Sequence, residues 1–331
     1  MIGYYIHHHG RGHLARATAI AEALDCPVTG LSSLPRPSDW RGDWVELPLD
    51  TSPSPADPTA GNRLHWAPIG HRGLRDRMSR ISQWIGDTGP AALVTDVSVE
   101  VGLLARLHGV PVVSVAMPGH RDDSVHSLGF EISTAVIAAW PAGAEGMITG
   151  LPAAAVRKIE HVGAISRFAG RRSEPNGAQG RVVVLGGAGG DDFTAQGVQD
   201  AREQTGSWEW VHLGASGTWA PDPWEHLLGA DVVVTHAGES AIADVSAARR
   251  PAIVIPQPRP FQEQWATASA LAGSPCPVTV QESFSGTDWA RLLEETAEFD
   301  GERWATWNDG RGAARAARII ARVAREHGAS A

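Results

Sequence analysis

The stretch "ADVVVTHAGESAIADVSAARRPAIVIPQP", residues 230–258, joins an apolar run, a short polar turn, a helical pattern and a second apolar run. Two such runs joined by a helix are typical of a parallel sheet with a crossover connection. The turn carries His236, Gly238 and Ser240, and Asp244 follows one helical turn later. Glycine lets backbone approach a ligand closely, and serine is a common helix N-cap, where free N–H groups attract anions. The stretch therefore predicts an anion site backed by a carboxylate.

The same alternation of strand and helix occurs in both halves of the chain, which predicts an α/β fold with two parallel sheets. The strands expected from their apolar runs are 2–6, 91–96 and 110–117 in the first half, and 181–187, 208–214, 230–236 and 251–256 in the second. We expect domains at residues 1–165 and 181–310, joined by the polar linker 166–180. Residues 311–331 predict an amphipathic terminal helix.

The composition describes a globular protein and excludes several classes. The chain has 331 residues, is 43% hydrophobic and carries a formal net charge of −9, which argues against non-specific nucleic-acid binding. No run approaches about 20 apolar residues, so we expect no transmembrane segment. The amino-terminal residues lack a signal-peptide pattern, and Cys26 and Cys276 form no disulfide framework. We therefore expect a cytoplasmic protein.

The turn "GRGHLARA", residues 10–17, follows the first expected strand. It fits a G-x-G-x-x-A dinucleotide pattern, but the acidic residue expected about 20 positions later is missing. His13 offers another interpretation, because it stands where ligands bind at the carboxyl end of a parallel sheet. It is either a general base or a helix-start histidine with a local hydrogen bond. Asp96, at the end of another strand, either caps the next helix or orients His13.

Two further patterns bear on phosphate and metal binding. The stretch "LGGAGGDD", residues 185–192, follows a strand, and we expect its Gly187 and Gly189 to bring backbone N–H groups close to phosphate oxygens. It lacks the lysine of a P-loop. The histidines at 7–9 alternate between two faces of the expected strand, with no cysteine or carboxylate beside them. We expect no metal site there.

The residues after the turn at 236–240 suggest a ligand with several hydroxyl groups. Asp244 would accept two hydrogen bonds from a vicinal diol such as that of ribose. Glu263 and Gln264 would bind further hydroxyls as acceptor and donor. A nucleotide diphosphate sugar carries a ribose diol, a pyrophosphate and sugar hydroxyls in this order.

These motifs resemble those of nucleotide-sugar-dependent glycosyltransferases with the GT-B fold. The similarity includes the peptidoglycan N-acetylglucosaminyltransferase and the natural-product and plant small-molecule enzymes. It rests on the Gly-His turn at 10–13, on Asp96 and above all on residues 218–264. The resemblance implies two Rossmann-like domains facing a cleft. Residues 1–165 would bind the acceptor and 181–310 the donor, and the helix at 311–331 would pack back on the first domain.

The resemblance also implies a role for each matching residue. His13 would be the base, held by Asp96. The donor would be bound by Gly187, Gly189, Trp219 (against the base), His236, Gly238, Ser240 (at the pyrophosphate), Asp244 (at the ribose), Glu263 and Gln264 (at the sugar). Gly12, His120 and His126 are expected on the acceptor side.

The function implied is inverting, metal-independent transfer of a sugar from a UDP- or dTDP-sugar to a hydroxyl of a small-molecule acceptor, with no cofactor. Two alternatives stay open: a nucleotide-sugar epimerase on the same fold, and a sugar-nucleotide-binding protein without turnover. The first usually has a different amino-terminal turn, and the second needs no base such as His13. A nicotinamide oxidoreductase is disfavoured by the missing acidic residue.

Overall fold

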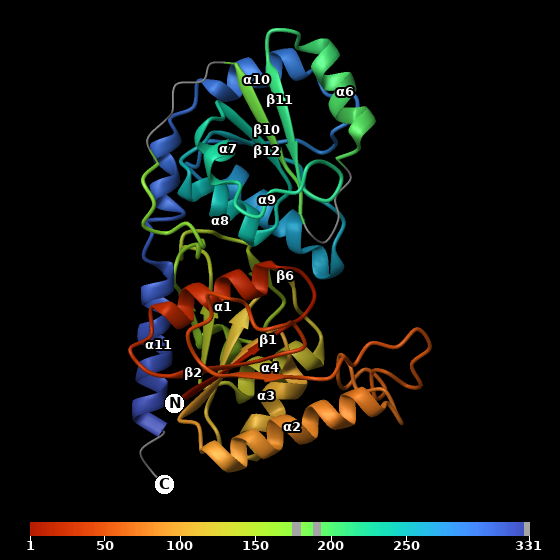
Figure 1. The fold of residues 1–331 in the computed structure, drawn as a ribbon, viewed down its shortest axis with the longest axis vertical. Coiled ribbons are helices and arrows are strands. Elements are labelled where there is room, and N and C mark those ends of the chain that lie inside the picture. The colour runs from red at the N-terminus through yellow and green to blue at the C-terminus, as the bar shows by residue number, and fades with distance from the viewer. Residues whose placement is uncertain (174–179, 188–192, 328–331) are drawn as a thin grey trace.

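The structure is a computed structural model that describes residues 1–173, 180–187 and 193–327. Two parallel sheets lie one above the other, each between helices (Figure 1). The first has seven strands in the order β3-β2-β1-β4-β5-β7-β9. Their bounds are β1 Ile2–Ile6, β2 Val28–Ser32, β3 Trp44–Glu46, β4 Ala92–Asp96, β5 Val112–Ala116, β7 Ala135–Ala138 and β9 Ile159–His161. The predicted α/β fold with two parallel sheets is confirmed.

The second sheet has five strands in the order β11-β10-β12-β13-β14. Their bounds are β10 Arg181–Leu185, β11 Glu209–Leu213, β12 Val232–Thr235, β13 Ala252–Val254 and β14 Val278–Val280. A small separate sheet pairs β6 (Gly119–His120) with β8 (Ile148–Thr149). In both large sheets the central strands are buried on both faces, which is why they read as continuous apolar runs in the sequence.

Helices cover both faces of each sheet. Those of the first half are α1 Gly12–Glu22, α2 Arg72–Thr88, α3 Val99–Leu107, α4 Ser124–Ile132 and α5 Ala153–Val156. Those of the second half are α6 Ala195–Gln204, α7 Trp224–Leu228, α8 Glu239–Ala247, the 3-10 turn η1 Pro260–Gln262, α9 Glu263–Ala272, α10 Trp289–Ala297, the 3-10 turn η2 Gly301–Thr306 and α11 Gly312–His327. No helix in these described ranges is both long and apolar enough to cross a membrane.

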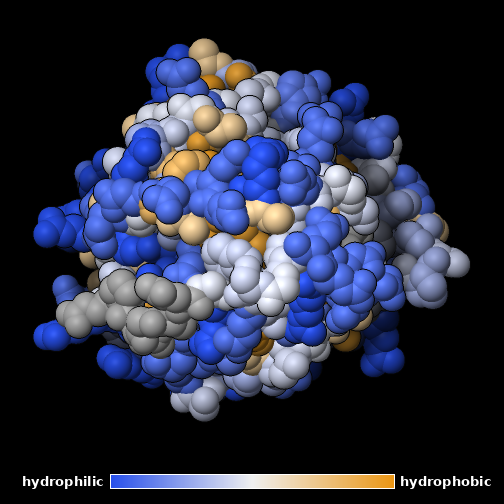
Figure 2. All heavy atoms as spheres, turned by 90° about the horizontal axis from the view of Figure 1, so that it is seen from above, coloured by the Kyte–Doolittle hydropathy of each residue, from blue (hydrophilic) through white to orange (hydrophobic). Residues whose placement is uncertain are grey.

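The terminal helix α11 packs along the side of the first sheet, so the end of the chain returns to the first half of the molecule (Figure 1). Its apolar residues Ala316, Ile320 and Val323 are buried in the same cluster as Ile20 of α1 and Val94 of β4. The arginines of α11 lie on its other side. At the opposite end of the molecule, hydrophilic residues cover most of the surface and hydrophobic ones show only in small separate areas (Figure 2).

One local prediction is wrong. Strand β1 ends at Ile6, so the three histidines at 7–9 lie in the following turn and do not alternate across a strand. Their rings pack together, with centroids 4.3 to 5.0 Å apart. Because β1 is short, this turn brings His9 and the start of α1 to the carboxyl edge of the sheet, where the site lies.

Candidate active site between the two sheets

A cavity of about 340 Å³ lies where the carboxyl ends of β1, β10 and β12 face one another. Its walls come from both halves of the chain. The first half contributes the turn at 9–13 and the start of α1, and the second contributes the ends of β10 and β11 and the start of α8. In open α/β sheets ligands bind at this edge, because loops and helix N-termini converge there.

His13 lines this cavity, and Asp96 lies behind it with no exposed surface. Strands β1 and β4 are neighbours, with Ile6 opposite Asp96, so both chain ends reach the same edge. The His13 Nδ1 lies 2.8 Å from the Asp96 Oδ1. When Nδ1–H donates to this carboxylate, Nε2 keeps its lone pair and can accept a proton. The pair has the geometry of a general base with an orienting carboxylate, and the helix after β4 is capped by Ser98 instead of Asp96.

Arg16 is a part of this group that the sequence reasoning missed. It lies one helical turn after His13, and its Nε and Nη2 donate to the two Asp96 oxygens at 3.1 and 2.7 Å. Burial alone would raise the pKa of Asp96, but Arg16 and His13 hold it well below its usual value. The spacing of three residues between two polar side chains on one helix was the available signal. Asp96 is therefore an ionised carboxylate beside His13 at neutral pH.

The cavity wall from the second half of the chain is built around His236, at the end of β12. The Gly238 N–H donates to its Nδ1 at 3.0 Å, so a neutral ring carries its proton on Nε2. A Cβ on Gly187 would lie 2.7 Å from that Nε2, and one on Gly238 would lie 2.6 Å from the ring. These glycines make room for the imidazole, in addition to lining the cavity. Gly189 lies outside the described residues.

Ser240 does not cap helix α8. The N-cap is Gly238, in an extended conformation, and the helix begins at Glu239. Ser240 is its second residue and lines the cavity. Its Oγ lies 2.3 Å from the position of a Cβ on Gly12, the first residue of α1. The expected acceptor-side glycine is thus a point of close approach between the two halves of the chain.

This contact gives a testable expectation. In Gly12→Ala, the new Cβ and the Ser240 Oγ cannot both keep their places, so the Ser240 side chain must rotate or α1 and α8 must separate. We expect a loss of roughly 1–3 kcal/mol in stability, visible as a lower Tm. Ser240→Gly in the same chain should recover part of the loss. The control is Gly86→Ala in α2, where nothing lies within 4 Å of the added Cβ. A Tm unchanged by Gly12→Ala would show that the close contact between Gly12 and Ser240 does not contribute to stability.

Asp244 lines the cavity but already has two partners. The Ser166 Oγ donates to its Oδ1 at 2.9 Å, and the Arg167 Nε donates to its Oδ2 at 3.0 Å. Burial raises the pKa of Asp244, against the opposing effect of Arg167 and Ser166. Arg167 also lines the cavity, so a ribose in this region would meet an arginine held in place by Asp244. No local sequence pattern indicates these partners, which lie 78 and 77 residues away in the chain.

Glu263 and Gln264 already have partners within the protein. The buried Gln264 accepts backbone hydrogen bonds from Ala237 at 3.2 Å and Gln257 at 2.8 Å, and so joins two loops of the second half of the chain. It still lines the cavity. Glu263 pairs with Arg121 at 2.6 Å and is absent from the cavity wall formed by the described residues. The adjacent positions at the start of α9 point these side chains in different directions.

Trp219 lies at the mouth of the cavity with 45% of its surface exposed. The guanidinium of Arg11 is 5.1 Å from the centre of its ring. A planar base could stack on such a ring, and Arg11 adds a positive charge from the first half of the chain.

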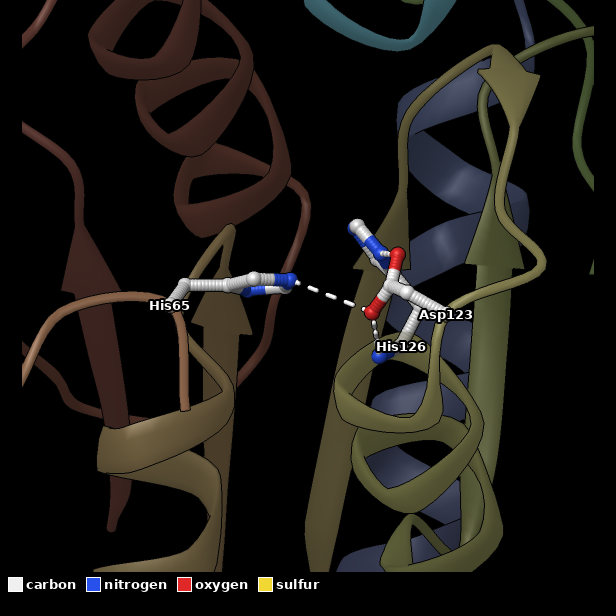
Figure 3. Close-up of side chains that lie close together, drawn as sticks. All are labelled: His65, Asp123 and His126. Carbon is white, nitrogen blue, oxygen red and sulfur yellow. Dashed lines mark hydrogen bonds and ion pairs between the residues drawn. The ribbon is translucent and has the colours of Figure 1, made fainter. Parts of the chain in front are cut away.

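The residues expected on the acceptor side separate from one another. His120 is exposed, bonds Thr149 and lies in neither of the two cavities lined by described residues. His126 is buried and lines a second cavity of about 50 Å³ in the first half of the chain. There it faces Asp123 and His65 (Figure 3).

The cluster of His65, Asp123 and His126 has side chains that commonly bind zinc. Its hydrogen bonds oppose that use. Arg121 donates to the His126 Nε2 at 3.0 Å, so the proton of the neutral ring is on Nδ1 and is directed to Asp123. Burial lowers the pKa of His126 to about 4, which keeps the ring neutral. A cation would need the Nδ1 lone pair and would lie close to the guanidinium of Arg121. The cluster fits a carboxylate–imidazole pair better than a metal centre.

Residues 220–283 match the family model described as the glycosyltransferase family 28 C-terminal domain. No curated protein matches the chain. Among solved structures, Acinetobacter baumannii MurG is 13% identical with a TM-score of 0.64, covering 97% of this chain and 99% of its own. A UDP-glucosyltransferase from Polygonum tinctorium capable of glucosylating indoxyl is 14% identical with a TM-score of 0.66, covering 98% of both chains. Medicago truncatula UGT71G1, solved with UDP-glucose, is 12% identical with a TM-score of 0.66, covering 99% of this chain and 98% of its own.

These similarities define the class of protein. The two parallel sheets have the GT-B architecture of these solved structures, and the segment that matches the family model contributes to the wall of the cavity. The protein is a glycosyltransferase of the GT-B type.

Proposed function

We propose that the protein transfers a sugar from a UDP- or dTDP-sugar to a hydroxyl group of a small-molecule acceptor, with inversion at the sugar carbon and without a metal. The observation that carries the proposal is His13, which is held by Asp96 and lines the same cavity as the N-terminus of α8. A base and an anion site that face one cavity are what a single displacement needs.

The proposed step begins with the acceptor hydroxyl beside the His13 Nε2. The hydroxyl oxygen attacks the sugar carbon as its proton passes to Nε2, and the bond from that carbon to the diphosphate breaks. The electron pair of this bond goes to the departing phosphate oxygen. Backbone N–H groups at the start of α8 and the Nε2–H of His236 stabilise the charge that develops. Since attack and departure occur on opposite faces of one carbon, the configuration inverts.

Positive side chains provide the counter-charge that a metal supplies in other enzymes. Arg11, Arg167 and Arg259 line the cavity, and Arg16 lies at its wall. A uridine or thymidine diphosphate is favoured by the similarity to a UDP-glucose-bound relative.

A thermal-shift panel of UDP, dTDP, GDP, NAD and NADP tests the donor class. UDP or dTDP at about 100 times Kd should stabilise the protein by about 2.7 kcal/mol, seen as a higher Tm. Asp244→Ala should weaken the shift, because Arg167 loses the carboxylate that positions it. His13→Ala should keep it. A shift with NAD or NADP alone would contradict the proposal, and the anomeric configuration of the product, read by NMR, tests inversion.

A further inference from the structure

Glu239 is a carboxyl group in the part of the cavity where phosphate oxygens are expected. It is the first residue of α8, it lines the cavity, and its side chain is only 10% exposed. Its Oε2 accepts a hydrogen bond from the Arg16 Nη1 at 3.2 Å. Its Oε1 is buried and has no hydrogen-bond partner among the described residues. An unpartnered buried oxygen of this kind requires an explanation.

Charge makes an ionised Glu239 unfavourable here. Arg16 already gives two of its N–H groups to Asp96, so two carboxyl groups share one guanidinium. An ionised Glu239 would also leave a charged Oε1 out of water and would repel a diphosphate. A neutral carboxylic acid avoids both problems, since Oε2 accepts from Arg16 while Oε1–H is a hydrogen-bond donor.

The surroundings of Glu239 support the neutral form. Arg16 from α1 favours its charge, whereas Asp96 from β4 and Glu263 from α9 oppose it. His13 and His236 line the same cavity. Burial, the largest effect, raises the pKa of Glu239 to about 7.

We propose that Glu239 binds the donor diphosphate as a neutral carboxylic acid, its carboxyl group turning so that the buried Oε1–H reaches the cavity and donates to a phosphate oxygen, and that donor binding therefore takes up a proton. The proposal rests on the proposed function, because it requires a nucleotide diphosphate in this cavity. Below about pH 6 the carboxyl group is already protonated, and binding takes up nothing. Above neutral pH the group is ionised in the free protein, so binding takes up close to one proton. The affinity then falls by up to about tenfold per pH unit.

Calorimetry measures this uptake directly. UDP and dTDP are titrated into the protein at about pH 8, where the terminal phosphate is already ionised, in two buffers with different ionisation enthalpies. The wild-type protein should take up about one proton per nucleotide. Glu239→Gln should bind with no uptake and with an affinity that changes little between about pH 7 and 9, because its amide accepts from Arg16 and donates to phosphate without titrating. Glu225→Gln, at an exposed first-turn position of α7, is the control and should behave as wild type.

The outcomes separate the two proposals. Binding of UDP or dTDP to the wild-type protein without proton uptake overturns the role of Glu239 and leaves the proposed function standing. Equal uptake by Glu239→Gln and wild type has the same meaning, since another group must then titrate. If neither nucleotide binds wild type or Glu239→Gln at any pH tested, the proposed function fails and this inference fails with it. If Glu239→Gln does not fold, the proton uptake of the wild-type protein alone decides whether the proposed role of Glu239 stands.

Discussion

Replacing His13 by alanine is expected to lower kcat by about 10²- to 10⁴-fold, with the affinity for UDP or dTDP changed only slightly. The variant removes the Nε2 that would accept the proton of the acceptor hydroxyl. Asp96 keeps its two hydrogen bonds from Arg16, so the wall of the cavity stays in place. The measurement is the initial rate of nucleotide diphosphate release from UDP- and dTDP-sugars with a panel of small hydroxylated acceptors, beside calorimetric nucleotide binding.

The matched control is His108→Ala. His108 is exposed at the end of α3, bonds Ser82 and lines neither cavity, so its loss should leave both quantities unchanged. A wild-type kcat in His13→Ala would show that His13 does not act as the base. Loss of nucleotide binding in His13→Ala would instead assign the residue to donor binding and contradict its proposed role as the base for the acceptor hydroxyl.

The main strands could be predicted from the sequence because parallel sheets bury both faces of a strand. The apolar runs at 2–6 and 181–187 became β1 and β10 almost residue for residue. Strand β2, "VTGLS", has no continuous apolar run, because Gly30 interrupts it, and the apolar pattern does not predict it. That glycine is required by packing: a Cβ there would lie 2.3 Å from the ring of Trp44. The contact with Trp44, which only the structure shows, explains why residue 30 is a glycine within a strand.

The candidate site, too, could be predicted only in part. His13 follows β1 and Asp96 ends β4, two strands that the apolar pattern predicts, and the adjacency of these strands brings the two residues together. The partners of Asp244 depend on how a segment near residue 166 crosses α8, which no local pattern encodes. Arg16 could be noticed beside His13, but its bond to Glu239 spans 223 residues and joins the two halves of the chain. Pairs of buried charged residues that come from distant parts of the chain can therefore be identified only in the structure.

Arg16 is the residue whose loss should affect stability most. Asp96 has no exposed surface, and Arg16 supplies two of the hydrogen bonds to its carboxylate. Removing one partner of a buried pair leaves an uncompensated charge, which usually costs about 3–5 kcal/mol. In the wild-type protein the pKa of Asp96 is lowered, so its contribution to stability is present above the unfolded pKa and is lost as pH falls through the folded pKa. Without Arg16, burial should raise that pKa instead.

Arg16→Met is accordingly expected to lose about 3–5 kcal/mol of unfolding free energy near pH 7 and less near pH 5, because the unpaired Asp96 then gains a proton on folding. Urea unfolding at the two pH values measures the difference. Adding Asp96→Asn to Arg16→Met should restore part of the loss, since a neutral amide carries no unpaired charge. The control is Arg72→Met, whose side chain is 89% exposed and whose ion pair with Asp76 is worth under about 1 kcal/mol. If Arg16→Met costs no more than Arg72→Met, or if Asp96→Asn lowers its stability further, the positive charge of Arg16 is not what holds Asp96 beside His13.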